Sequence, residues 1–157
     1  KPQMIVVNHS EDQTPIQIET PFASTTVVSM PAKLEMDIAQ LPEDEAQVFL
    51  AEYGIEEPGL NRFIRLSYDL LGLQSFFTAG DKETHAWTVA RGALAPEAAG
   101  VIHSDMQKGF IRAEVVSYDD LIHLGSFAEA RNQGRLRVEG KKYVMQDGDV
   151  IEIRFNI

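Results

Sequence analysis

The sequence contains no cysteine, few basic residues and no long apolar segment. The absence of cysteine excludes disulfides and thiolate chemistry, which is consistent with a reducing compartment, and we therefore expect a cytoplasmic protein. No run of about 18 apolar residues is present, so neither a transmembrane helix nor a membrane partner is expected. No basic stretch followed by an apolar core opens the sequence, so no secretory signal is expected.

The charge balance is acidic and uneven. Fourteen basic and 24 acidic residues give a net charge of −10 over the 157 residues, which argues against bulk affinity for nucleic acid. Residues 1–72 carry four basic and twelve acidic residues, whereas residues 73–157 carry ten and twelve. In the second part, a cluster of five cations has only two acids near it in the sequence, Glu129 and Glu139. The five cations are Arg131, Arg135, Arg137, Lys141 and Lys142. Such a cluster is either a solvated face or an RNA contact, and both readings stay open.

Two apolar, β-branched segments in the first part predict strands. They lie at residues 3–7 and 25–29. The connection at 12–24 has two prolines and no helical period, so we expect an irregular segment or a short edge hairpin there. Because the first residue is Lys1 and a strand follows at once, we expect the chain to have been cut from a longer protein.

Three helices are predicted before residue 73. The first follows from the spacing of Leu34, Ile38 and Leu41, and the second opens at Pro42 and ends before Gly54. The third starts near Pro58 and carries an apolar stripe at helical spacing: Leu60, Phe63, Ile64, Ser67, Tyr68 and Leu71. We expect this stripe to be packed core.

The second part alternates short strands with helices. Strands are expected at 75–78, 85–89 and 110–116, with helical pieces at 96–103 and 118–131. The last 22 residues, LRVEGKKYVMQDGDVIEIRFNI, predict strand, turn, strand, turn, strand. A small sheet crossed by one or two helices indicates an α+β domain.

No catalytic or metal-binding motif is apparent. A P-loop requires G-x-x-x-x-G-K-[ST], and the nearest match, at Gly134 to Lys142, lacks both the spacing and the hydroxyl. The four histidines have no metal-ligand spacing, and no nucleophile elbow occurs. We therefore predict no catalytic residue and no metal ligand. What remains is Asn8-His9-Ser10-Glu11 at the end of the first strand, which is either an ordinary loop or a ligand-binding corner.

The residues from 57 onward closely resemble the YchF/Obg-like ATPase family of P-loop proteins. The shared motifs are FTAG, AWT, APEAAG, IHSD, KGFIRAE and the ending EGKKYVMQDGDVIEIRFN. The resemblance implies that residues 73–157 form a TGS domain, a β-grasp fold similar to ubiquitin. It implies that residues 57–72 form a linking helix. Residues 1–56 would then hold the last strands of a P-loop α/β G domain and a helical connection.

The resemblance also implies a nucleotide site in the first part. The family reads its base with Asn-x-x-Glu and prefers ATP with Mg²⁺, and Asn8 and Glu11 match this motif by type and spacing. The implied base-binding residues are Asn8, His9, Glu11, Ser29 and Met30. The family's helix after this motif has no counterpart here, and the P-loop is absent. We therefore expect no nucleotide bound to this chain alone and no hydrolysis by it.

Finally, the resemblance implies ribosome association. Ribosomal RNA would be contacted by the basic cluster of Arg131, Arg135, Arg137, Lys141 and Lys142, with Lys108 and Arg112 as a second group. An alternative is a non-catalytic β-grasp adaptor that binds RNA, or a protein partner on its exposed sheet.

Overall fold

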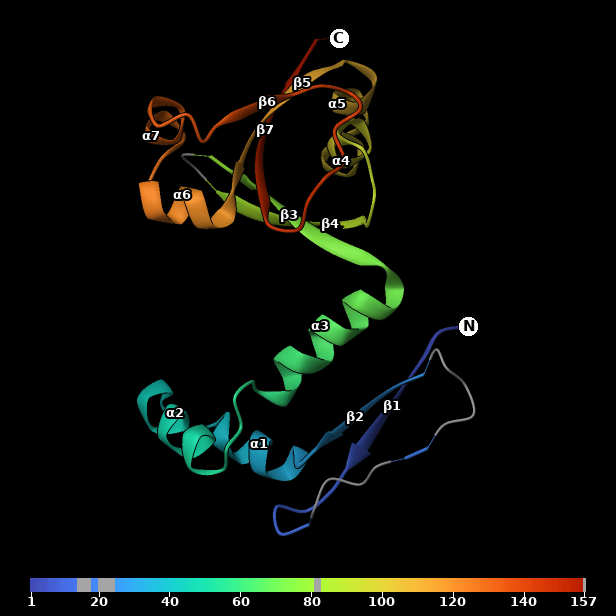
Figure 1. Ribbon diagram of the computed structural model, residues 1–157, viewed down its shortest axis with the longest axis vertical. Helices are drawn as coiled ribbons and strands as arrows, with labels where there is room; N and C mark the ends of the chain where they lie inside the picture. The colour runs from blue at the N-terminus through green and yellow to red at the C-terminus, as the bar shows by residue number, and fades with distance from the viewer. Residues whose placement is uncertain (14–17, 20–24, 81–82, 157) are drawn as a thin grey trace. The chain divides into compact units, whose positions relative to one another are not determined.

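A computed structural model describes residues 1–13, 18–19, 25–80 and 83–156 (Figure 1). The chain divides into two compact units, Lys1–Leu71 and Gly72–Ile157. Most of the predicted irregular connection at 12–24 lies outside the described residues.

The first unit is built on two parallel strands. Strand β1 (Gln3–Asn8) pairs with β2 (Thr25–Met30), in a register that sets Gln3 opposite Thr25 and Asn8 opposite Met30. Both strands are rich in β-branched and apolar residues, which favour extended backbone. Because the strands run in the same direction, their carboxyl ends meet at one edge.

Three helices follow in the first unit. They are α1 (Ala32–Ile38), α2 (Glu43–Glu52) and α3 (Gly59–Leu71). Proline precedes each helix, where its fixed φ suits a helix start and its missing N–H costs nothing. Helix α2 also has three acidic residues in its first turn, which complement the positive end of the helix dipole.

The apolar stripe of α3 is not the packed core that its periodicity predicted. Leu60 is 68% exposed, Ile64 48% and Leu71 63%. Periodicity decides which side chains share a helix face, but burial requires a second element against that face. Among the described residues of this unit, α3 makes its main contacts with β1 and β2, which do not cover the whole stripe.

The second unit contains a mixed five-stranded sheet. Its strands are β3 (Leu73–Ala79), β4 (Thr84–Ala90), β5 (Phe110–Ser117), β6 (Arg137–Glu139) and β7 (Asp149–Phe155). They lie in the order β4-β3-β7-β5-β6. Strand β3 runs parallel to the central strand β7, and the other neighbours are antiparallel. The predicted α+β domain, a small sheet crossed by helices, is confirmed in its coarse form as a mixed α/β fold with a mixed sheet.

Helices cover both faces of this sheet (Figure 1). Helices α4 (Ala95–Ile102) and α5 (Ser104–Lys108) pack on one face, and α6 (Tyr118–Leu124) and α7 (Phe127–Asn132) on the other. Since neighbouring residues of a strand point to opposite faces, Val115 joins the first cluster and Val116 the second.

Two predicted elements of the second unit are wrong in detail. The helix expected at 118–131 is two helices, because Gly125 takes φ 77° as a left-handed cap and the Ser126 hydroxyl accepts from Glu129 N at 3.1 Å. The middle strand expected in the last 22 residues is not part of the sheet. Instead, Met145 is buried under α4, its N–H donating to Ala93 O and its carbonyl accepting from the Gln74 side chain.

Among the described residues, no helix is both long enough and apolar enough to cross a bilayer.

Candidate functional site

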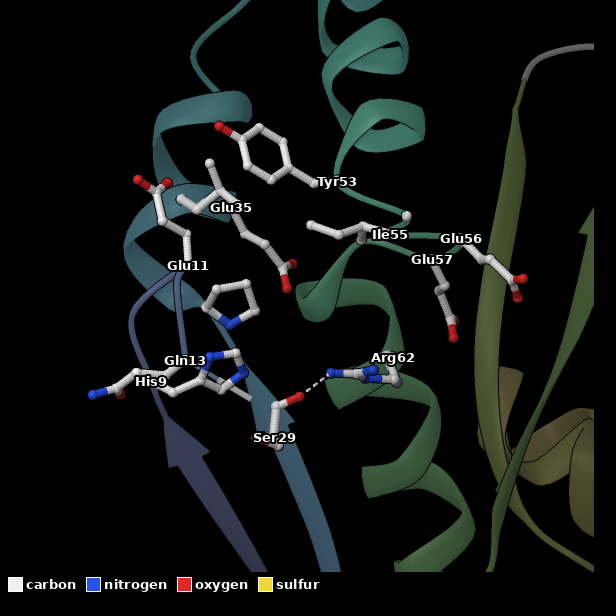
Figure 2. Close-up of a pocket in the computed structure, with 13 residues that line it drawn as sticks. His9, Glu11, Gln13, Ser29, Glu35, Tyr53, Ile55, Glu56, Glu57 and Arg62 are labelled. Carbon is white, nitrogen blue, oxygen red and sulfur yellow. Dashed lines mark hydrogen bonds between the residues drawn. The ribbon is translucent and has the colours of Figure 1, made fainter. Parts of the chain in front are cut away.

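A pocket of about 460 Å³ opens where the two parallel strands of the first unit end. Its walls come from the loops after β1 and β2, from α1, from the segment after α2 and from α3 (Figure 2). The lining residues include His9, Glu11, Gln13, Ser29, Glu35, Tyr53, Ile55, Glu56, Glu57 and Arg62. The carboxyl end of a parallel strand pair is the usual ligand-binding edge of an α/β sheet.

The structure brings three of the five predicted base-binding residues into this pocket, namely His9, Glu11 and Ser29. Asn8 does not line it; its Oδ1 accepts from Ala32 N at 3.1 Å and so ties the end of β1 to the loop after β2. Met30 lies in a separate, apolar hollow with Val6. Of the five predicted residues, three therefore line the pocket, Asn8 joins two loops, and Met30 lies in an apolar hollow.

The opposite wall of the pocket was not predicted from the sequence. Arg62 reaches from α3 and donates from Nη2 to Ser29 O at 2.5 Å. The Glu35 carboxylate accepts from Gly59 N, which fastens the first turn of α3 to α1. A Cβ on Gly59 would meet the carboxylate at the end of the flexible Glu35 side chain, which would have to move. Hydrophobic periodicity does not report polar contacts at a helix start, so the sequence did not predict the roles of Arg62 and Glu35.

The pocket is acidic. In the described part of the chain its lining holds a single arginine or lysine, Arg62, and four carboxylates, those of Glu11, Glu35, Glu56 and Glu57. Arg65 Nη2 donates to Glu57 Oε2 at 2.7 Å. This hydrogen bond lowers the pKa of the Glu57 carboxyl and keeps it ionised. Carboxylates accept hydrogen bonds and repel anions, so the pocket suits a neutral ligand group rich in donors rather than a phosphate.

Two pocket-lining residues each have a buried polar side-chain atom without a hydrogen-bond partner among the described residues. The atoms are Ser29 Oγ and Arg62 Nε. Over the same residues, no group of three or more His, Asp or Glu side chains converges in a way that could hold a metal ion.

The basic residues of the second unit are for the most part paired with acids. Arg131 contacts Glu114 at 2.8 Å, and Lys108 contacts Asp105 at 3.7 Å. Arg135 lies 4.0 Å from Asp120. These pairs reduce the positive charge that the sequence count suggested.

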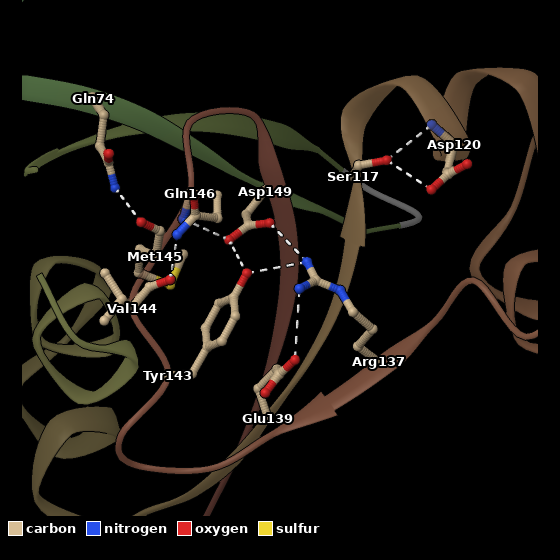
Figure 3. Close-up of polar contacts among 10 residues, drawn as sticks. All are labelled: Gln74, Ser117, Asp120, Arg137, Glu139, Tyr143, Val144, Met145, Gln146 and Asp149. Atoms are coloured by element: carbon tan, nitrogen blue, oxygen red, sulfur yellow. Dashed lines mark hydrogen bonds and ion pairs between the residues drawn. The ribbon is translucent and has the colours of Figure 1, made fainter. Parts of the chain in front are cut away.

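Arg137 belongs to a buried polar network (Figure 3). Its Nη2 donates to Asp149 Oδ1 at 3.2 Å, and the Tyr143 hydroxyl donates to Asp149 Oδ2 at 2.8 Å. Gln146 N donates to the same oxygen at 2.9 Å, and Asp149 is only 2% exposed. Burial, together with the hydrogen bond to Asp149, raises the pKa of Tyr143 to about 12. Arg137 thus braces the turn before β7, and part of its guanidinium is committed to that contact.

Three predicted contact residues have no ion pair within the described part of the chain. These are Arg112, Lys141 and Lys142, all exposed. Arg112 also faces Arg154 directly across β5 and β7, and Arg154 is itself paired with Glu152 at 3.0 Å and Glu114 at 3.5 Å. These cations are therefore more available to a polyanion than Arg131 or Arg137.

Parallel strands with a polar pocket at their carboxyl ends, together with a mixed sheet covered on both faces, define a protein of the mixed α/β class. The chain belongs to the YchF family. Residues 73–156 match the YchF-GTPase C-terminal family, described as a protein of unknown function (DUF933).

Close relatives and solved structures agree with this assignment. The "Ribosome-binding ATPase YchF" of Bacillus subtilis is 47% identical over 167 aligned residues, covering 100% of this chain and 46% of that protein. The protein of the same name from Haemophilus ducreyi is 49% identical over 164 residues, covering 100% and 45%. The Schizosaccharomyces pombe YchF GTPase structure has a TM-score of 0.72 at 32% identity, covering 83% of this chain and 34% of that one. The chain therefore spans about half the length of the curated relatives it matches.

Proposed function

We propose that this chain supplies the base-binding corner and the docking domain of a cytoplasmic, ribosome-binding ATPase. The observation that carries the proposal is the meeting of His9, Glu11 and Ser29 in one pocket at the carboxyl ends of β1 and β2. The names of the relatives, "Ribosome-binding ATPase YchF", support both parts of the proposal, ATP hydrolysis and ribosome binding.

The chemistry of the pocket fits an adenine base. Glu11 accepts hydrogen bonds only, and the amino group of adenine donates them. The acidic lining repels phosphates, which would lie outside this pocket with Mg²⁺. Since the sequence has no P-loop, phosphate binding and hydrolysis require residues that this chain does not contain. We expect the chain alone to bind ATP more weakly than about 100 μM.

The base-reading role can be tested in a protein of the relatives' full length. Replacing Glu11→Asp together with His9→Lys should shift nucleotide preference from ATP toward GTP, because the shorter carboxylate suits the donors of guanine. Competition binding measures the ratio, and Glu56→Asp, the same change elsewhere in the pocket, is the matched control. An unchanged ATP/GTP ratio in the double variant would contradict a base-reading role.

The proposed docking domain is the second unit, as a TGS domain of β-grasp type. Its strand order, with the last strand at the centre of the sheet and parallel to the first, supports this assignment. Ribosomal RNA is the proposed partner. The contact centres on Arg112, Lys141 and Lys142, with the paired residues Lys108, Arg131 and Arg135 at its margin and Arg137 acting mainly as a brace.

Charge reversal tests this contact. Lys141→Glu with Lys142→Glu should weaken ribosome co-sedimentation of the full-length protein, and added salt should weaken the wild type in parallel. Lys33→Glu, an exposed reversal in the first unit, is the control and should have little effect. Equal pelleting of the double variant and the wild type across a salt series would exclude this surface.

A second candidate is a non-catalytic adaptor that binds RNA or protein through the second unit. The observation in its favour is the extensive apolar core of that unit. The two functions differ in one measurement. An adaptor pellets with ribosomes equally with and without ATP, whereas a nucleotide-controlled protein does not.

A further inference from the structure

One wall of the pocket is formed by the end of helix α2, where Tyr53 lies. Tyr53 is the C-terminal cap of α2, and its N–H donates to Phe49 O at 3.0 Å. Gly54 then takes a left-handed φ of 65°, and Ile55 N donates back to Leu50 O at 2.8 Å. This is a Schellman-type helix end, which fixes the backbone on both sides of Gly54. The turn therefore places both Tyr53 and Ile55 on the pocket wall.

The Tyr53 ring is available to a ligand. Tyr53 is 47% exposed although it lines the pocket, and Figure 2 shows its ring projecting from the end of α2 toward α1. Among the described residues that line this pocket, it is the only Phe, Tyr or Trp. A phenol ring offers a large flat face on a side chain with few torsions, so holding it against a ligand costs little conformational entropy.

A purine base needs two kinds of surface around it. Its edge carries hydrogen-bond donors and acceptors, whereas its two faces are flat and largely apolar. The loops after β1 and β2 bring His9, Glu11 and Ser29, which can pair with the edge of a base. The end of α2 brings Tyr53 and Ile55, which offer flat and apolar surface instead. Aromatic side chains bind bases of every kind in this way, because every base has a π-face.

We propose that Tyr53 is a base-stacking residue, whose ring packs on the face of the purine while Glu11 accepts a hydrogen bond from its edge. The proposal rests on the nucleotide-binding function proposed above, and it adds the end of α2 to the surface that binds the nucleotide. The two residues then have separate tasks. Glu11 selects the base through hydrogen bonds, whereas Tyr53 adds affinity without distinguishing adenine from guanine.

Titrations with and without a base separate stacking from other roles. In a protein of the relatives' full length, affinity is measured for ATP, for GTP and for inorganic tripolyphosphate, which has no base. Tyr53→Ala should weaken ATP and GTP binding by about tenfold each, while the ATP/GTP ratio and the binding of tripolyphosphate stay as in the wild type. Tyr53→Phe, which keeps the ring, should bind ATP nearly as tightly as the wild type. Phe49→Ala, one turn earlier on α2 and not lining this pocket, is the matched control and should match the wild type for all three ligands.

A spectroscopic signal reports on the stacked ring itself. A base stacked on an indole quenches the fluorescence of the indole, so the emission of Tyr53→Trp should be quenched by ATP and not by tripolyphosphate. Phe49→Trp, on the same helix, should show no quenching by either ligand. The signal of Trp87 is measured in the wild type and subtracted from both. Because this variant keeps an aromatic ring, it decides the question even if Tyr53→Ala does not fold.

Unchanged ATP affinity in Tyr53→Ala, or a Tyr53→Trp emission that ATP does not quench, would overturn the proposal. A changed ATP/GTP ratio in Tyr53→Ala would also overturn it, because the side chain would then act through the position of Glu11. The failure of the proposed function looks different. A full-length wild type that does not bind ATP overturns both proposals. ATP binding that responds to the exchange at His9 and Glu11, without any response to Tyr53, removes only Tyr53 from the base site.

Discussion

The two units of the chain are stabilised in different ways. Of the described residues 1–71, only Val28 and Ile38 are buried hydrophobics. The second unit, by contrast, buries two apolar clusters on the two faces of its sheet, with Phe76, Val115 and Ile151 at most 1% exposed. Burial of apolar surface is the main favourable term in folding, so the second unit has much the larger reserve of stability.

The first unit relies instead on polar contacts between loops and helix ends. The Asn8 side chain accepts a hydrogen bond from Ala32 N, and the Glu35 carboxylate accepts one from Gly59 N. The Arg62 guanidinium donates one to Ser29 O. A net contribution of about 1 kcal/mol for each such bond cannot replace a core. The proposed ligand site thus lies in the weakly packed unit. A ligand that binds only the folded state of this unit would stabilise it.

The largest expected effect tests this comparison in two matched variants. Phe76→Ala, at a side chain 0% exposed, should cost about 3–5 kcal/mol of unfolding free energy, because it leaves a cavity between the sheet and α4. Phe63→Ala, at a side chain 39% exposed, should cost about 1 kcal/mol or less. Denaturation followed by Trp87, the only tryptophan, reports on the second unit, and hydrogen exchange of the amides of α1 to α3 reports on the first. Equal losses in the two variants would remove the contrast between the units.

The polar network around Asp149 should give the next largest effect. Asp149→Ala leaves the Tyr143 hydroxyl, Arg137 and Gln146 N without their shared acceptor, and should cost about 2–3 kcal/mol. Glu139→Ala, which removes a more exposed partner 3.6 Å from Arg137, should cost less than about 1 kcal/mol. Urea denaturation of both variants measures the difference, and a larger loss in Glu139→Ala would contradict the brace assigned to Asp149.

A glycine contact at the end of the sheet should produce a moderate effect. A Cβ on Gly109 would meet the backbone of Asn156, so Gly109→Ala should cost about 1–3 kcal/mol through displacement of the chain after β7. Gly140→Ala is the control, since no atom lies within 4 Å of its Cβ position, and should change stability by less than about 0.5 kcal/mol. Thermal unfolding compares them; equal midpoints would show that the end of the sheet adjusts freely.

The last prediction concerns the alkaline pH dependence of stability that Tyr143 contributes. Its pKa is about 12 in the folded protein against 10.0 normally, so the folded state holds this proton more tightly than the unfolded state. The resulting stability is fully present below about pH 10 and is lost as pH rises through the folded pKa. Tyr143→Phe should remove this alkaline dependence, as measured by denaturation from pH 9 to 12. A wild type with no loss of stability over that range would exclude the shift.

Much of the local structure was predictable, since it follows from short-range chemistry. The prolines and apolar spacings located the helices of the first unit, and β-branched runs located both of its strands. The family was also recognisable from the motifs of residues 57–157, and the comparisons confirm it. Gly125 and Ser126 carried the signal for the break between α6 and α7, although the prediction joined the two helices.

The sequence by itself determined most of the elements, and it indicated the end of β1 as a candidate ligand site, because strand ends, caps and turns depend on neighbouring residues. Only the tertiary structure decided that Arg62 and Glu35 complete the pocket opposite Glu11. It also decided that Arg137 faces a buried carboxylate while Lys141 has no acid nearby within the described residues. Charge and hydrophobicity are properties of a residue, but pairing and burial depend on what the fold places against it, often many residues away along the chain.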